Sequence, residues 1–292
     1  MIVRSIADGV EVLAPAKLNL YLEVLKRRPD GYHEIESLMV AVDLFDELTV
    51  VDEPSGSIVL ECDDPSLPID GRNLVVKAAE LLKSASAVEA GARIRLKKRI
   101  PAQAGLAGGS SDAAATLAAL DRLWGLGCSP ERIDELAGRI GSDVAFFPHA
   151  PAAVCRGRGE IVEPLSLPSP LHFVLVAPPV GVSTVDVYRR LKPPERPREI
   201  GPVLDVLTGG GPSELGRSLF NRLQPVAESL CPDLAKARDA LATLDPPLCG
   251  SLMSGSGSAY FGLCRDRAAA EEAAAVLKPL GLGLVRVVTC GP

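Results

Sequence analysis

The chain has 292 residues, of which 47% are hydrophobic and 23% are charged, a composition typical of a folded globular protein. Its net charge of −6 argues against a nucleic-acid partner, because proteins that bind nucleic acids carry a broad basic surface. No apolar run is long enough to span a membrane, and the N-terminal segment lacks the apolar core of a signal peptide. The seven cysteines are scattered and do not have the spacing of metal ligands. These features predict a cytoplasmic protein that binds neither membranes nor nucleic acids.

The first half of the sequence predicts a strand-rich unit with helices on one side. Residues 10–26 alternate between apolar and polar side chains, which is typical of a strand with one buried face. A Pro-Asp-Gly turn follows this segment. Further strands are expected at 35–51, 57–62 and 93–100, and helices at 73–84, 110–124 and 130–140. The last of these helices has Ser129 as its N-cap.

The second half predicts a small α+β sandwich. Its elements read in the order strand, helices, strand, helix, strand, with the helices expected at 218–230, 232–243 and 268–280. The strands are expected at 172–179, after the glycine loop of 251–264, and at 283–290. We place the boundary between two domains near residue 163, so that the domains comprise residues 1–163 and 164–292.

A glycine-rich loop stands directly before an alanine-rich helix, in the sequence RIPAQAGLAGGSSDAAATLAAL at 99–120. A helix N-terminus carries unpaired N–H groups and a partial positive charge, and glycines let a ligand approach the backbone. Gly105, Gly108 and Gly109 supply this close approach here, while the hydroxyls of Ser110 and Ser111 could reach a phosphate oxygen or Mg²⁺. The loop matches neither GxxxxGK[ST] nor GxGxxG. The alternative reading is a glycine-rich helix cap without a ligand.

Three segments together resemble the motifs of the GHMP kinases: PAKLNLYLEVLKRRPDGYHEIESL at 15–38, IPAQAGLAGGSSDAA at 100–114 and MSGSGSAYF at 253–261. The first segment and GSDVAFF at 141–147 resemble the 4-diphosphocytidyl-2-C-methyl-D-erythritol kinases in particular. The resemblance implies an α+β, two-domain GHMP kinase fold. Its N-terminal, ATP-binding domain would be like domain 2 of ribosomal protein S5, and its C-terminal domain would be a ferredoxin-like α/β sandwich.

The same resemblance implies a reaction and its cofactors. With ATP and Mg²⁺, the γ-phosphate would pass to the 2-hydroxyl of a small molecule, the cytidine diphosphate-linked methylerythritol of isoprenoid biosynthesis. Two alternatives stay open at this point. One is a GHMP kinase for another small alcohol, and the other is an inactive GHMP-fold protein that binds or regulates.

Two residues match the catalytic positions of the family. The resemblance implies that Lys17 is the catalytic lysine and that Asp143 is the general base. Phosphoryl transfer depends mainly on positioning and charge neutralisation, to which a cation and a proton-accepting carboxylate are suited. Taken without the resemblance, Lys17 would be a solvated lysine on an outward strand face, and Asp143 would be a helix N-cap.

The remaining site residues also follow from the resemblance. Tyr32, His33 and Tyr188 would hold the cytosine, Asn19 would bind near the reacting end, and Arg158 would clamp a phosphate. The residues expected to bind ATP are Asn73, Pro101, Gly105, Leu106, Ala107, Gly108, Gly109, Ser110 and Ser111. Asn73 could instead be a plain N-cap, and Tyr188 could simply pack on a helix face. The motif at 254–258 is expected to support the site, and the pattern identifies no metal ligands.

Ala107 and the basic segment 93–99 carry two further expectations. Ala107 stands where the family often has glycine, which predicts a negative φ and a methyl group that points away from the phosphates. Basic residues alternate along 93–99, which favours a solvated face on an edge strand over a nucleic-acid site.

Overall fold

A computed structural model describes residues 1–291 of the chain. These residues form two compact units, and neither unit is one continuous stretch of sequence. The first unit comprises residues 1–16, 44–100 and 107–150, and the second comprises residues 17–43, 101–106 and everything from Pro151 on. The division into domains 1–163 and 164–292 stays a prediction. Within the described part of the chain, no helix is long and apolar enough to cross a membrane.

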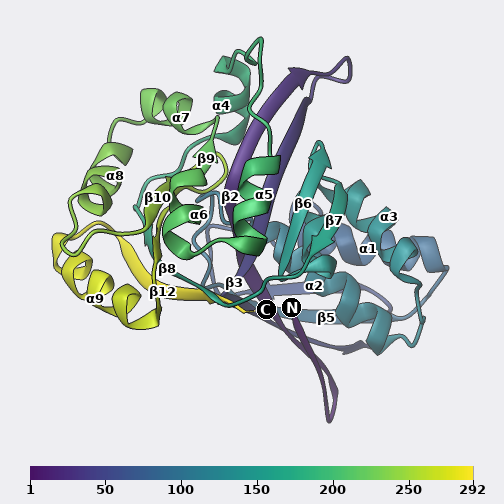
Figure 1. Cartoon of the computed structure of the whole chain (residues 1–292). Coiled ribbons are helices and arrows are strands. Elements are labelled where there is room, and N and C mark those ends of the chain that lie inside the picture. Colours follow the sequence, from purple (N-terminus) through teal and green to yellow (C-terminus); the bar gives the residue numbers. More distant parts are fainter. Residues whose placement is uncertain (292) are drawn as a thin grey trace. The chain divides into compact units, whose positions relative to one another are not determined.

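The first unit combines paired strands with a group of helices (Figure 1). Strand β1 pairs antiparallel with the start of β2, while β5 lies between β3 and β4, antiparallel to the former and parallel to the latter. Helices α1, α2 and α3 pack against one another. The strands are β1 (Ile2–Ile6), β2 (Gly9–Arg27), β3 (His33–Glu53), β4 (Ile58–Cys62) and β5 (Gly91–Lys97). The helices are α1 (Leu74–Ser86), α2 (Gly108–Leu123), α3 (Pro130–Ile140) and the 3₁₀ helix η1 (Val144–His149).

Strands β2 and β3 begin in one unit and continue in the other. In the second unit, β6 pairs antiparallel with β3 and β7, and β9 pairs parallel with β2. A separate antiparallel sheet has the order β10-β11-β8-β12. The strands are β6 (Ala152–Gly157), β7 (Ile161–Leu165), β8 (Leu171–Ala177), β9 (Phe220–Asn221), β10 (Gly250–Met253), β11 (Tyr260–Cys264) and β12 (Leu284–Cys290).

The helices of the second unit are α4 (Thr184–Arg190), α5 (Gly201–Gly209), α6 (Pro212–Ser218), α7 (Gln224–Leu230), α8 (Leu234–Ala242), α9 (Arg267–Leu277) and the 3₁₀ helix η2 (Lys278–Leu280). Helices α8 and α9 contact the four-stranded sheet and lie beside it in Figure 1. Their apolar residues, such as Leu241 and Leu277, share one buried cluster with Val174 and Tyr260 of the sheet. Burial of this kind is the main driving force for the α+β sandwich.

Most predicted elements are present, and three local expectations are wrong. The strand at 10–26 is buried on both faces over residues 14–24, where Asn19, Tyr21 and Glu23 are covered as completely as the leucines. The basic segment 93–99 includes a central strand and not an edge, since β5 has a partner on each side. The helix expected at 218–230 begins only at Gln224, because Phe220 and Asn221 pair with β2.

Candidate active site

Lys17 and Asn19 lie two residues apart on β2, and both are buried, with Lys17 only 3% exposed. The reading of Lys17 as a solvated lysine is therefore wrong. Its ammonium donates a hydrogen bond to Asn19 Oδ1, and Asn19 Nδ2 donates to Ser37 Oγ over 2.8 Å. The Ser37 hydroxyl donates to the Tyr21 carbonyl over 2.7 Å. Since Ser37 uses its single proton on Tyr21, only the NH₂ side of the Asn19 amide can face it, and the amide oxygen is directed at Lys17.

The first part of the glycine loop and the third motif pack against these residues. Ser254 Oγ accepts from Asn19 N over 3.3 Å and donates to the Gly105 carbonyl over 3.0 Å. Gly105 has a φ of +74°, and a Cβ at this position would lie 2.0 Å from Ser254 O, so that only glycine fits. Lys17 N also donates to Leu106 O over 3.1 Å. The backbone around Lys17 is thus held by both motifs.

Tyr32, His33, Arg158 and Tyr188 lie in two contacting pairs in the second unit. Arg158 Cζ is 4.9 Å from the centre of the Tyr32 ring, and Tyr32 is 54% exposed. The His33 and Tyr188 rings have centroids 5.2 Å apart and are tilted by 37°. Burial lowers the pKa of His33, and the charge of Arg27 lowers it further, so the imidazole is neutral at pH 7. The exposed Tyr32 ring and a neutral imidazole are suited to stacking on a base and hydrogen bonding its edge, while Tyr188 is partly buried against the hydrophobic cluster of this unit.

The second part of the glycine loop opens helix α2 in the first unit. Its N-cap, Ala107, has a φ of +55° and makes no side-chain capping bond. The expected negative φ is therefore wrong, and the left-handed conformation costs an alanine about 1–2 kcal/mol. Because Ala107 has no capping side chain, the first N–H groups of α2 are suited to an anion. Ser111 Oγ is buried and has no hydrogen-bond partner among residues 1–291.

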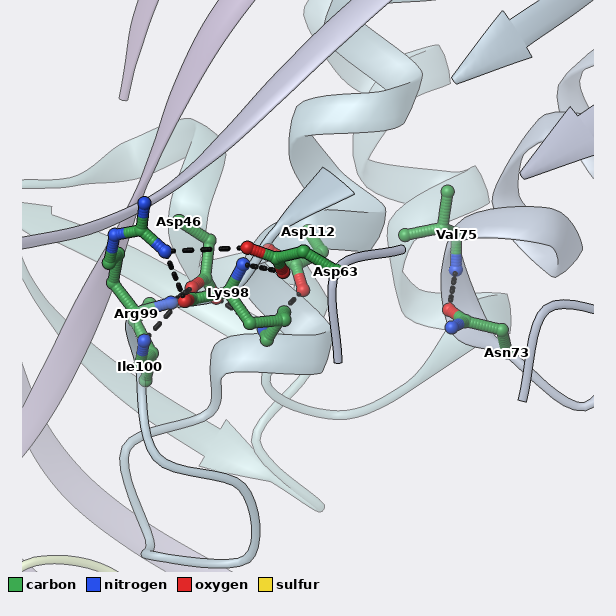
Figure 2. A network of polar contacts seen from close by, with 8 residues as sticks. All are labelled: Asp46, Asp63, Asn73, Val75, Lys98, Arg99, Ile100 and Asp112. Atoms are coloured by element: carbon green, nitrogen blue, oxygen red, sulfur yellow. Dashed lines mark hydrogen bonds and ion pairs between the residues drawn. The ribbon is translucent and has the colours of Figure 1, made fainter. Parts of the chain in front are cut away.

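Asn73 and Asp143 also belong to the first unit. Asn73 is the N-cap of α1: its side chain accepts from Val75 N over 2.9 Å and donates to Pro68 O over 2.8 Å (Figure 2). The N-cap reading is thus confirmed, and the adenine contact stays a prediction. Asp143 precedes η1, but its side chain makes no capping bond to that helix. Asp143 thus occupies the N-cap position, as the capping alternative expected, but without a side-chain capping bond.

A buried charge network lies at the base of α2 (Figure 2). Lys98 Nζ donates to Asp112 Oδ2 over 2.7 Å and to Asp46 Oδ2, and the Lys98 side chain is 9% exposed. Burial raises the pKa of Asp112 to about 7, although the Lys98 charge opposes this rise. Burial alone would lower the pKa of Lys98, but the Asp112 and Asp46 charges outweigh it and raise the pKa.

An ion pair between the buried Glu23 and the partly exposed Arg222 anchors β2 beyond Asn19. Arg222 Nε and Nη2 each donate to the Glu23 carboxylate over 2.7 Å, and Arg198 N donates to it over 3.0 Å. Burial alone would raise the pKa of Glu23, but these hydrogen bonds outweigh it and lower the pKa. Next to Arg222, Asn221 Nδ2 donates to the Gly255 carbonyl over 2.7 Å. The ion pair therefore connects the strand that carries Lys17 with the backbone of the third motif.

Sequence reasoning missed Ser37, Asp46, Lys98, Asp112 and Glu23. Three of them carried a readable signal, because each stands at an inward position of a strand or strand end that is otherwise apolar. Ser37 is in phase with Ile35 and Met39, Asp46 with Leu44 and Leu48, and Lys98 with Ile94 and Leu96. A polar residue at such a position needs a buried partner.

The chain matches two family models. Residues 73–154 match the model described as the GHMP kinases N terminal domain, and residues 204–279 match the GHMP kinases C terminal model. Among curated proteins, the 4-diphosphocytidyl-2-C-methyl-D-erythritol kinase of Pelotomaculum thermopropionicum is 44% identical over 268 residues, covering 91% of this chain and 93% of the relative. The enzyme of the same name from Salinibacter ruber is 42% identical, with 92% and 95% covered.

Solved structures agree with this assignment. A crystal structure of 4-(cytidine 5'-diphospho)-2C-methyl-D-erythritol kinase has a TM-score of 0.79 and 39% identity, and the match covers 97% of this chain and 99% of that one. Homoserine kinase from Cytophaga hutchinsonii has a TM-score of 0.78 at 23% identity, covering 99% and 96%. At that identity the second match shows the shared fold alone.

Proposed function

The chain belongs to the GHMP kinases and, among them, to the family of 4-diphosphocytidyl-2-C-methyl-D-erythritol kinases, and we propose that it catalyses the reaction of that family. It transfers the γ-phosphate of ATP to the 2-hydroxyl of the cytidine diphosphate-linked methylerythritol. The product continues towards isoprenoid precursors. The alternatives of another small-alcohol kinase or an inactive binding protein receive no support from the relatives.

One observation carries the proposal: the same strand, β2, holds the buried ammonium of Lys17 and leads into the aromatic residues expected to bind the base. Lys17 is buried and directed by Asn19, the turn after β2 carries Tyr32, and His33 is the first residue of β3. A kinase for a substrate without a base would have no use for the exposed Tyr32 ring.

We assign the chemistry to two residues. The Asp143 carboxylate accepts the proton of the 2-hydroxyl as that oxygen attacks the γ-phosphorus, the bond to the bridging oxygen of ADP breaks, and ADP leaves. The Lys17 ammonium stabilises the negative charge of the reacting group. Asn19 fixes the direction of Lys17 and lies near the acceptor, and proton acceptance by a positioned base contributes about 10²–10⁴ in rate.

The binding roles follow the two units separately. In the second unit Tyr188, His33 and Tyr32 hold the cytosine, and Arg158 faces the diphosphate. In the first unit the N-terminus of α2, from Gly108 to Ser111, holds the phosphates of ATP, and Asn73 lies near the adenine. We also assign ATP binding to the remaining residues of the glycine loop, which are Pro101, Gly105, Leu106, Ala107 and Gly109.

We also propose that Mg²⁺ accompanies ATP. Residues 1–291 contain no group of three or more His, Cys, Asp or Glu side chains arranged to hold a metal ion. The buried, unpartnered Ser111 hydroxyl fits a hard cation held mainly by phosphate oxygens, and Ser110 is the second candidate. When bound, Mg²⁺ supplies positive charge that neutralises the phosphates.

A substrate panel tests the proposal. ADP release is measured with ATP, Mg²⁺ and the cytidylated methylerythritol, and in parallel with mevalonate, homoserine and galactose. We expect turnover on the cytidylated compound alone. Turnover on a control compound instead would overturn the substrate assignment, and ATP binding without turnover on any of them would favour an inactive binding protein.

A further inference from the structure

The charge network at the base of α2 joins three elements of the first unit. Asp46 comes from β3, Lys98 directly follows β5, and Asp112 lies in the first turns of α2. The side chains of Asp46 and Asp112 are 0% and 3% exposed, so both carboxylates are removed from water. Figure 2 shows Lys98 directed between them. Two buried carboxylates are therefore bridged by one ammonium.

Asp46 also contacts the segment before the glycine loop and the segment after it, and both segments belong to the first unit. Its Oδ1 accepts the backbone N–H groups of Arg99 and Ile100, the latter over 2.9 Å. On the other flank, a Cβ added to Gly108 would lie 3.3 Å from Asp46 Oδ2 and 3.0 Å from Ile100 Cγ2. Gly108, the first residue of α2, thus packs on the Asp46 carboxylate, and the same carboxylate binds the backbone of the segment that ends at Ile100. A shift of Asp46 would move both flanks.

The charges of the network matter because the network lies next to the first turn of α2. The first turn of α2 is suited to phosphates by its N–H groups and its partial positive charge. Carboxylates buried behind that turn repel a phosphate through a medium that screens poorly. The Lys98 ammonium, in contact with both, compensates this repulsion. Without it, the carboxyl groups of Asp46 and Asp112, the latter partly protonated at pH 7 because burial raises its pKa to about 7, would lie close to the anion site without the ammonium that offsets their negative charge.

We propose that Lys98 is a positioning residue for the phosphates of ATP: its charge offsets the negative charge that Asp46 and Asp112 share behind the N-terminus of α2, and its hydrogen bonds to both keep Gly108 and the segment ending at Ile100 in place. The inference rests on the proposed use of ATP. Lys98 is expected to affect the binding of ATP and not the binding of the alcohol substrate, which we assign to the second unit.

The test compares Lys98→Met with Lys97→Met. Lys97 is the adjacent lysine, but its side chain is 60% exposed and pairs with Glu47 on the surface. We measure the Kd of ATP by calorimetry on folded protein, and KM for ATP and for the alcohol. For Lys98→Met we expect ATP to bind at least about 10-fold more weakly, with KM of the alcohol changed less than twofold. Lys97→Met is expected to bind ATP like the wild type.

The same comparison in the Asp112→Asn variant keeps the test decisive if Lys98→Met does not fold. In Asp112→Asn one buried negative charge is removed while the side-chain oxygen can still accept from Lys98. We expect Lys98→Met/Asp112→Asn to bind ATP at least about fivefold more weakly than Asp112→Asn, and Lys98→Arg to retain most of the affinity. Equal affinity with and without the lysine, in either background, would overturn the inference. A wild type that binds no ATP would instead overturn the proposed function.

Discussion

Asn19 Nδ2 donates a hydrogen bond to Ser37 Oγ over 2.8 Å, and this bond determines which face of the amide meets Lys17. The two residues come from neighbouring positions of β2 and β3, 18 residues apart in sequence. Ser37 touches no reacting group in the proposed mechanism. It acts through Asn19, and its role can be separated from that of Lys17 by mutation.

Replacing Ser37 by alanine removes the acceptor for Asn19 Nδ2 and the donor to the Tyr21 carbonyl. Buried groups left without partners cost about 1–3 kcal/mol, so we expect a loss of stability of that size. We also expect kcat to fall about 10-fold with KM for ATP unchanged, because the Asn19 amide is no longer held in one orientation. Chemical denaturation and steady-state kinetics measure both effects. Ser37→Thr keeps the hydroxyl and should retain kcat; an equal loss in both variants would contradict the role of the hydroxyl.

The catalytic assignment makes a sharper prediction. Asp143→Asn and Lys17→Ala should each lower kcat by at least about 10²–10⁴, because one removes the proton acceptor and the other the stabilising cation. ATP affinity, measured by calorimetry, should stay within a few-fold of the wild type. Circular dichroism checks that both variants fold. Near-wild-type turnover in either variant would remove that residue from the mechanism.

The fold could be predicted largely from local patterns, and the buried polar network only in part. Strand alternation, N-cap signals such as Ser129, and the glycine loop give strong local signals, and they predicted most elements. Alternation alone predicts a solvated polar face for β2, because the residues that cover it, such as Arg222, lie nearly 200 residues away in sequence. Periodicity in one strand does not reveal what covers the strand.

The conformation of Ala107 shows another limit. A side chain without branching is compatible with a negative φ, and the sequence offered no reason to expect otherwise. The structure has φ at +55° at this N-cap position. Such a conformation depends on the segments that the residue joins. The type of a residue other than glycine does not predict a positive φ.

Ala107→Gly should stabilise the protein by about 0.5–1 kcal/mol. Relief of the left-handed alanine gains about 1–2 kcal/mol, and the added freedom of glycine in the unfolded chain offsets about 0.5–1 kcal/mol of it. Ala87 at the end of α1 has a φ of +51° and offers a matched control outside the site, for which we expect a similar gain. Ala118→Gly within α2 should instead cost about 1 kcal/mol. Urea unfolding measures all three; destabilisation by Ala107→Gly would contradict the strain argument.

Tyr188→Ala should raise KM for the cytidylated substrate about 5- to 150-fold, since stacking of a base on an aromatic ring contributes about 1–3 kcal/mol. KM for ATP should not change, because Tyr188 contacts His33 in the second unit. Tyr188→Phe keeps the ring and should stay within a few-fold of the wild type. If Tyr188→Ala leaves the substrate KM unchanged, Tyr188 only packs on its helix face.

The Glu23–Arg222 pair predicts a pH-dependent contribution to stability. The pKa of Glu23 is lowered in the folded state, so the folded chain binds fewer protons than the unfolded chain. The contribution is therefore complete above the ordinary glutamate value of about 4.3 and is lost as the pH falls through the lower, folded pKa.

Glu23→Gln leaves Arg222 without its buried charge partner, and we expect a loss of about 2–4 kcal/mol at pH 7. The difference in free energy of unfolding between wild type and variant should stay constant from pH 7 to 5 and shrink below pH 4.5, as measured by urea unfolding at each pH. Glu61→Gln, which disrupts surface pairs with Arg93 and Arg95, should cost less than about 1 kcal/mol at pH 7. A gap for Glu23→Gln that widens as the pH falls would mean that Glu23 is not stabilised as a carboxylate by Arg222.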